Sequence, residues 1–240
     1  AKLLPSALLY RVSHADIYQQ DRLSSPYQIP VLEFSDIASF SSIQPSLSIS
    51  VEADLPLKQA PESKIIMFRN SNGKEEHFAI VVGEGLSVKE PLVRLHSQCL
   101  TGDVFGSLKC DCGEQLQTAL SLMSNEGAGV VLYLAQEGRD IGLLNKIRAY
   151  ALQDAGLDTI EANHSLGFDT DERGFSTAVE MLDLLELSHI KLLTNNPDKV
   201  KQLSELGITI TQRLPLVLPT NPYNENYIKV KKEKTGHLIS

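Results

Sequence analysis

The sequence predicts an α/β fold in which a mixed sheet is flanked by helices and preceded by an irregular N-terminal extension. Two observations predict it. From residue 64 onward, short apolar runs that suit strands alternate with longer stretches whose apolar residues recur at helical spacing. Before that point Ser and Pro are frequent and no helical period is evident. We therefore predict an extension at residues 1–60 and a globular domain at residues 61–240.

The elements of the first half follow from local signals. In the extension, the run Ile29-Pro-Val-Leu-Glu-Phe could form an edge strand. The turn sequence Asn70-Ser-Asn-Gly-Lys separates two strand-like runs at residues 64–69 and 77–82. Leu116, Leu120 and Met123 share one face of a helix at residues 113–126. Further strands are predicted at residues 92–96 and 129–134.

The second half continues the alternation. Helices are predicted at residues 141–155, 176–187 and 197–206, and strands at residues 190–194 and 208–211. Pro197 suits the first turn of the last of these helices, and Gly207 follows its end. The tail carries Lys229, Lys231, Lys232 and Lys234, and we expect it to be solvated.

Composition limits the classes of function. The chain of 240 residues has a formal net charge of −8, which argues against general binding to nucleic acid. A small anionic ligand needs only a local basic pocket and stays possible. No apolar run approaches the ~18 residues that span a bilayer, and the first residues lack a secretion signal. We expect a cytoplasmic protein without nucleic-acid or membrane partners.

Three cysteines, Cys99, Cys110 and Cys112, are the strongest chemical signal. An odd number of cysteines this close together is a poor disulfide framework, whereas three thiolates suit zinc. Three protein ligands with an open position indicate a catalytic site, and His96 as a fourth ligand would make the site structural. Three buried, unligated cysteines are the remaining alternative.

Three further segments predict an anion site with acid–base groups. The turn Gln136-Glu-Gly-Arg-Asp-Ile-Gly follows a strand and opens a helix, so it can present backbone N–H groups and Arg139 to an anion. Lys146 and Arg148 could extend the basic surface or could form a solvated helix face. Asp171 and Arg173 could orient water or hold charge in a site, or they could form an ordinary surface ion pair. Thr194 and Lys199 suit phosphate contacts at a strand end, although this segment could instead cap a helix.

Together these segments resemble the GTP cyclohydrolase II family over roughly residues 60–240. The resemblance is carried by Arg94-Leu-His-Ser-Gln-Cys-Leu-Thr-Gly-Asp, Leu108-Lys-Cys-Asp-Cys-Gly-Glu-Gln and the stretch from Gln136 to Asp154. Asp158 to Phe168, Asp171-Glu-Arg and Leu192-Leu-Thr-Asn-Asn-Pro complete it. The ordered series is far more specific than any single motif.

The resemblance implies a zinc-dependent enzyme that converts GTP to a diaminopyrimidinone ribosyl phosphate, formate and pyrophosphate at the start of riboflavin synthesis. It implies one catalytic Zn²⁺ per chain, Mg²⁺ on the triphosphate, and a homodimer. Asp171 is the expected proton acceptor, Arg173 the residue that acts on the α-phosphate, and Tyr150 a neighbour of the guanine ring. Because arginine keeps its proton, we expect Arg173 to stabilise charge. The implied zinc ligands are Cys99, Cys110 and Cys112, and the implied GTP contacts are Arg94, Leu95, His96, Ser97, Gln98, Gln115, Glu137, Gly138, Arg139, Thr159, Thr194 and Lys199.

Two departures from the family pattern lie near the expected site. Gln98 stands where Glu is expected, and Leu134-Ala135 replace a more polar pair. Either could alter affinity or product. Two other functions are therefore kept: a paralogue that stops at the formamidopyrimidine nucleotide, and a non-catalytic zinc and nucleotide module used in regulation.

Overall fold

The computed structural model of the chain describes residues 46–71, 76–234, 236 and 238. Leu47–Asn70 and Glu75–Ser240 belong to one compact unit. The suggested edge strand at residues 29–34, like the rest of residues 1–45, lies outside the described residues. β1 falls inside the range predicted for the extension and pairs with the sheet, while the role of the extension stays a prediction.

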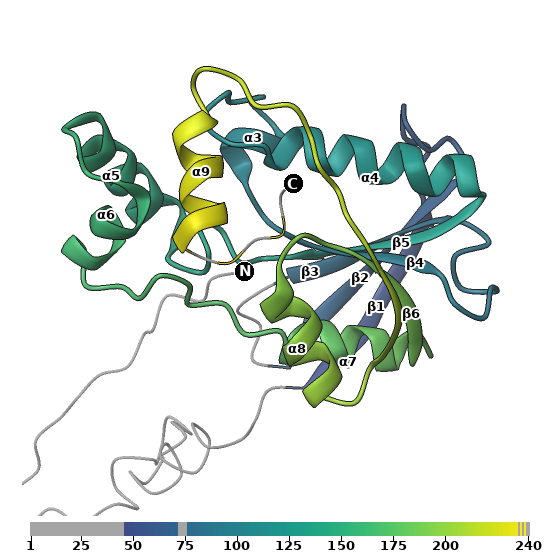
Figure 1. Ribbon diagram of the computed structural model, residues 1–240. Helices are drawn as coiled ribbons and strands as arrows, with labels where there is room; N and C mark the ends of the chain where they lie inside the picture. Colours follow the sequence, from purple (N-terminus) through teal and green to yellow (C-terminus); the bar gives the residue numbers. More distant parts are fainter. Residues whose placement is uncertain (1–45, 72–75, 235, 237, 239–240) are drawn as a thin grey trace, which may run out of the picture. The chain divides into compact units, whose positions relative to one another are not determined.

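A mixed sheet of seven strands organises the unit, in the order β1-β2-β3-β5-β4-β6-β7 (Figure 1). The first four strands in this order pair antiparallel. From β5 onward, each neighbour pairs parallel. The mixed α/β fold expected from the sequence is thus confirmed. The strands are β1 (Leu47–Asp54), β2 (Ser63–Asn70), β3 (Glu76–Gly83), β4 (Leu92–Ser97), β5 (Ala128–Leu134), β6 (His189–Leu193) and β7 (Thr209–Leu214).

Helices cover both faces of the sheet. Figure 1 shows α4 above the sheet and α7 and α8 below it, while α5, α6 and α9 gather at one end. The helices are α3 (Leu100–Asp103), α4 (Cys112–Glu126), α5 (Gly142–Asp154), α6 (Thr159–Ser165), α7 (Ser176–Leu184), α8 (Pro197–Glu205) and α9 (Glu225–Lys234).

Alternation along the central strand β5 explains the two cores. Val130 and Leu132 pack with α7 residues such as Met181 in one buried cluster. Val131 points to the other face and packs with Leu120 and Met123 of α4. Gly129 permits this contact, because a Cβ there would lie 2.2 Å from Met123 Cγ. Both faces of β5 are therefore buried, as expected for a strand at the centre of a two-sided sheet.

Among the described residues, every predicted element occurs with shifted ends, and four elements were not predicted. The helix predicted at residues 176–187 ends at Leu184, and the strand predicted at residues 208–211 extends to Leu214. β1, α3, α6 and α9 were not predicted. Within the described part of the chain, no helix is long and apolar enough to cross a membrane.

Candidate active site

A pocket opens at the carboxyl ends of the parallel strands β4, β5 and β6, where ligands of such sheets usually bind. Its wall comes from segments far apart in the sequence: the end of β4, the start of α4, α5, α6, α8 and α9. The predicted site residues that line it are Arg94, Leu95, His96, Ser97, Gln98, Cys99, Cys110, Cys112, Gln115, Gly138, Arg139, Tyr150, Thr159, Arg173, Thr194 and Lys199.

The three cysteines converge at one end of this pocket. Cys99 immediately precedes α3, and Cys110 and Cys112 lie at the start of α4. Their sulfur atoms all lie within 4.8 Å of one another, and the Sγ atoms of Cys99 and Cys110 are 3.7 Å apart. Tetrahedral zinc with Zn–S bonds of ~2.3 Å requires sulfur atoms about 3.8 Å apart. The three thiols are free, so this donor set fits zinc.

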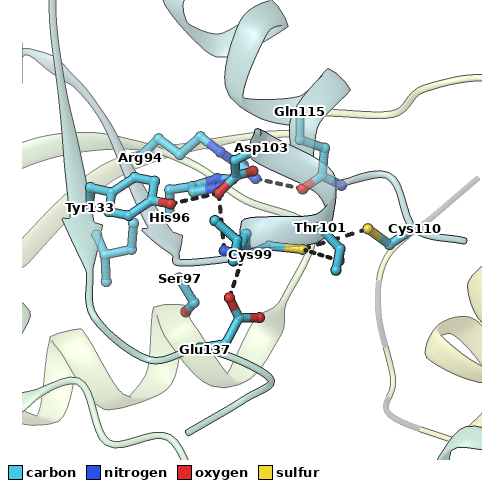
Figure 2. A network of polar contacts seen from close by, with 12 residues as sticks. Arg94, His96, Ser97, Cys99, Thr101, Asp103, Cys110, Gln115, Tyr133 and Glu137 are labelled. Atoms are coloured by element: carbon cyan, nitrogen blue, oxygen red, sulfur yellow. Dashed lines mark hydrogen bonds and ion pairs between the residues drawn. The ribbon is translucent and has the colours of Figure 1, made fainter. Parts of the chain in front are cut away.

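His96 does not join the thiols as a fourth ligand. Its Nε2 atom lies 3.1 Å from both carboxylate oxygens of Asp103 (Figure 2). Asp103 also accepts hydrogen bonds from the Tyr133 hydroxyl at 2.8 Å and from the Cys99 backbone N–H at 3.0 Å. Burial lowers the pKa of His96. These hydrogen bonds hold the Cys99 turn in place. Among the described residues, the group of side chains that could hold a metal consists of the three cysteines.

A buried ion pair supports the thiols from the other side. Lys146 Nζ lies 3.0 Å from Cys99 Sγ and 2.7 Å from Glu137 Oε1. The other Glu137 oxygen accepts a hydrogen bond from the Leu100 backbone N–H at 2.7 Å. Hydrogen bonds from Cys110 and Cys112, together with that of Lys146, hold the pKa of the Cys99 thiol far below its usual range. Lys146 is thus buried beside the thiols. Arg148 is exposed, so it belongs to the solvated face of the helix.

Glu137 and Asp171 are the two predicted site residues outside the pocket wall. Each one pairs with a cation that does line it. Asp171 accepts hydrogen bonds from Nε and Nη2 of Arg173, and Arg173 Nη1 lies 3.3 Å from the Ser97 hydroxyl. Burial opposes the charge on Arg173, yet the hydrogen bonds to Asp171 outweigh it and raise the pKa of Arg173. Burial likewise acts to raise the pKa of Asp171, but Arg173 lowers it overall.

Three other cations of the pocket are held by neutral oxygens. Lys199 Nζ donates to the Leu95 carbonyl at 2.8 Å, Arg139 donates to the Thr170 carbonyl at 2.9 Å, and Arg94 donates to the Gln115 side chain. Burial and then the nearby charges of Arg173 and Arg94 hold the pKa of Lys199 well below its usual value. Crowded like charges of this kind favour an anionic ligand between them.

Comparison with known proteins identifies the family. The model of the GTP cyclohydrolase II family matches residues 48–215. The chain belongs to the GTP cyclohydrolase II family. It is 52% identical over 176 residues to the GTP cyclohydrolase-2 of Buchnera aphidicola, covering 73% of this chain and 91% of that protein. The Escherichia coli enzyme of the same name is 49% identical, with 78% of this chain and 100% of that protein covered.

A longer relative shows that this chain does not span every GTP cyclohydrolase II protein. The GTP cyclohydrolase-2 of Azospirillum brasilense is 42% identical across 100% of this chain, which covers 62% of that protein. A solved two-domain 3,4-dihydroxy-2-butanone 4-phosphate synthase from A. baumannii reaches a TM-score of 0.35 at 15% identity, over 76% of this chain and 44% of that one. That likeness is too low to support an argument.

The family match begins at β1 and ends before α9, so it differs at both ends from the range of the resemblance. Within it, the segment after β6 serves two purposes. Thr194 lines the pocket, while the Asn196 side chain caps α8 by accepting a hydrogen bond from the Asp198 N–H at 2.9 Å. The capping interpretation is therefore confirmed for Asn196, while a phosphate contact of Thr194 stays a prediction.

Sequence reasoning missed part of the pocket wall. It is lined by Lys109 and Asn163, which lie in segments of the family resemblance but were assigned no role. It is also lined by Tyr227 and Lys231, which lie in a segment where no site was predicted. The solvated tail predicted from its lysines is wrong for Lys231, which is 9% exposed and 2.8 Å from Asp111 Oδ1. The spacing of Tyr227 and Lys231, one helical turn apart, was the available signal.

Proposed function

We propose that this chain hydrolyses GTP to 2,5-diamino-6-ribosylamino-4(3H)-pyrimidinone 5′-phosphate, formate and pyrophosphate, the first step of riboflavin synthesis. One observation carries the proposal. The pocket has a cluster of three thiols at one end and seven basic side chains around it, while its described wall contains no carboxylate. In a chain of net charge −8, this local reversal of charge selects a polyanion.

The thiol end of the pocket suits the ring-opening half of the reaction. Cys99, Cys110 and Cys112 would hold Zn²⁺, and the ion would supply Lewis-acid activation for the hydrolysis at C8 of the guanine ring. The absence of His96 from the cluster leaves room for a non-protein ligand, which is the arrangement of catalytic zinc sites. The Lys146–Glu137 pair keeps the Cys99 turn and its thiol in place.

The cationic end suits the triphosphate. Arg173, aligned by Asp171, would stabilise negative charge on the α-phosphate as pyrophosphate leaves, and Lys199 and Arg139 would hold the outer phosphates. Mg²⁺ is the hard cation expected on the phosphate oxygens. Because both Asp171 oxygens already accept from Arg173, the geometry supports an orienting role for Asp171 more directly than proton acceptance.

The remaining predicted contacts lie between these two ends. The wall from Arg94 to Gln98, with Gln115, Gly138 and Thr159, would surround the base and ribose. Tyr150 faces the thiol end, where Lys109 Nζ lies 5.1 Å and Lys146 Nζ 5.9 Å from its ring centroid. This position suits a side chain that holds the ring or the formamide formed from it.

Product analysis tests the function directly. The purified chain is incubated with GTP, Zn²⁺ and Mg²⁺, and formate, pyrophosphate and the pyrimidine nucleotide are measured. Release of all three supports the proposal. A reaction that stops at the formamidopyrimidine nucleotide would assign the chain to the paralogue class, and GTP binding without turnover would assign it to the regulatory class.

A further inference from the structure

The C-terminal helix α9 forms a wall of the pocket that the family match at residues 48–215 does not include. Figure 1 shows α9, in yellow, near the start of α4, where Lys231 contacts Asp111. The segment is fixed at both ends. Asn224, just before the helix, is fully buried, and the Leu238 N–H beyond it donates to the Asn195 carbonyl at 2.8 Å. α9 is therefore held across the carboxyl end of β6.

The face that α9 turns to the pocket carries a buried cation. Tyr227 and Lys231, one turn apart, line the pocket, while Lys229 and Lys232 point to solvent. The Lys231 ammonium lies 2.8 Å from Asp111 Oδ1 and 4.4 Å from the centroid of the Tyr227 ring. Removing an ammonium from water is costly, so a helix with a largely polar surface gains little stability by burying this one.

The carboxylate that faces Lys231 is shared. Asp111 also accepts a hydrogen bond from Gln115 Nε2, and Gln115 Oε1 accepts one from Arg94. One negative charge thus stands between two cations, one from α9 and one from β4. Burial lowers the pKa of Lys199, and the nearby charges of Arg173, Arg94 and Lys231 lower it further. The wall around Lys231 therefore keeps an excess of positive charge.

We propose that Lys231 is a substrate-binding residue whose ammonium contacts the phosphate chain of the nucleotide, and that α9 closes the pocket over it. This proposal rests on the proposed function, because it takes the ligand to be a nucleoside triphosphate. Lys231 lies next to Asp111, the residue between Cys110 and Cys112, and within reach of the charges at the phosphate end. The Lys231 ammonium would therefore lie at the junction between the ribose and the phosphate chain of the nucleotide.

Calorimetric titration of the full-length chain tests the contact with two probes. One is a GTP analogue with a methylene bridge between the α- and β-phosphates, and the other is guanosine, which has no phosphate. Lys231→Gln should weaken binding of the analogue about ten- to hundred-fold, as expected for a lost charge-assisted contact, and change guanosine binding less than about two-fold. Lys231→Arg should keep most of the affinity. Lys232→Gln removes the same charge from an exposed neighbour and should leave both affinities unchanged.

The outcomes separate the two proposals. Equal affinity of Lys231→Gln and the native chain for the analogue would overturn the contact, as would an equal loss for analogue and guanosine, which indicates a structural wall. A native chain that binds neither probe would overturn the proposed function itself. A second measurement needs no variant: the analogue should slow tryptic cleavage after Lys229 and Lys232, and cleavage at an unchanged rate would overturn the closure.

Discussion

The Arg173 side chain shows how one ion pair can determine a chemical role. Two nitrogens of its guanidinium donate to Asp171, and this pairing holds the side chain as a cation although it is buried. A permanently charged, planar group cannot act as a free amine, but it can stabilise charge on a phosphate whose position it fixes.

Substitutions at Arg173 should therefore affect the release of pyrophosphate first. Arg173→Ala should lower that rate by about 10²–10³-fold, because it removes a preorganised charge. Arg173→Lys should recover little, since an ammonium cannot reproduce the two-pronged contact with Asp171. A coupled pyrophosphate assay measures both variants. Arg148→Ala removes an exposed arginine from α5 and should be neutral. A native rate for Arg173→Ala would disprove the role.

The thiol cluster predicts a separation of the two hydrolyses. Cys110→Ser should carry well below the ~1 zinc per chain expected of the native protein, because a serine hydroxyl does not ionise near neutral pH. Formate release should be lost, while some pyrophosphate release should persist, since the phosphate end of the pocket is untouched. Elemental analysis and the two product assays check this. Native formate release from a zinc-free variant would exclude zinc from the ring opening.

Tyr150 should act as a hydrogen-bond donor near neutral pH. Burial, partly opposed by Lys146, raises the pKa of its phenol to about 12, so the proton stays on the oxygen. Tyr150→Phe keeps the ring and removes only that donor, and we expect the formamide intermediate to accumulate or turnover to fall about 10–100-fold. Mass spectrometry of the products decides between these. Tyr223→Phe, at a tyrosine that is 69% exposed, is the matched control and should behave as native.

Single residues also show where sequence reasoning stops. The three cysteines and the Arg94–Gln98 segment belong to an ordered motif series, so their place in one pocket could be predicted. The burial of Lys146 and Lys231 in the pocket wall could not be predicted, because a lysine on a helix is usually solvated. Only the fold shows that Glu137 and Asp111 lie opposite them, at 2.7 Å and 2.8 Å.

Whole elements divide in a similar way. The helices α4 and α7 bury an apolar face, which makes their periodicity visible in the sequence. β1 is exposed at almost every position and α3 has four residues, so neither has a readable pattern. α6 is short, but its capping box from Asp158 to Glu161 was a usable signal. α9 buries Lys231 on the pocket side, and its lysine-rich sequence is otherwise typical of a solvated tail.

The short helix α3 is shaped by the thiols against which it packs. A Cβ atom at Gly102 would lie 3.0 Å from Cys110 Sγ and 3.1 Å from Cys99 Sγ, closer than ordinary contacts. Gly102→Ala should spread the sulfur atoms and weaken zinc binding about ten-fold or more, with the fold retained. Competition with a chromogenic chelator measures the affinity. Gly174→Ala is the control, because nothing lies within 4 Å of its added Cβ. Equal zinc affinity for both variants would contradict the packing argument.

The molecule as a whole keeps two kinds of surface apart. The chain has a net charge of −8, yet cations line the pocket among the described residues, so an anionic substrate would be attracted to the pocket. A second surface is apolar. Val104, Phe105 and Leu108 lie in the loop after α3 and are 67%, 73% and 52% exposed. The Lys109–Asp154 ion pair at 2.6 Å holds the end of this loop against the end of α5.

This apolar surface, defined by Val104, Phe105 and Leu108, predicts where the expected homodimer forms. Exposed apolar side chains grouped in this way usually mark an interface between proteins. A carboxylate placed there would be desolvated without a partner, so Phe105→Glu should shift the dimer toward monomers by about a hundred-fold or more in dissociation constant. Leu206→Glu, at a 47% exposed leucine after α8, changes charge equally and should leave the dimer intact. Sedimentation velocity at micromolar concentration distinguishes the two species. If the native chain is monomeric, or if Phe105→Glu dimerises like the native chain, the interface lies elsewhere or does not exist.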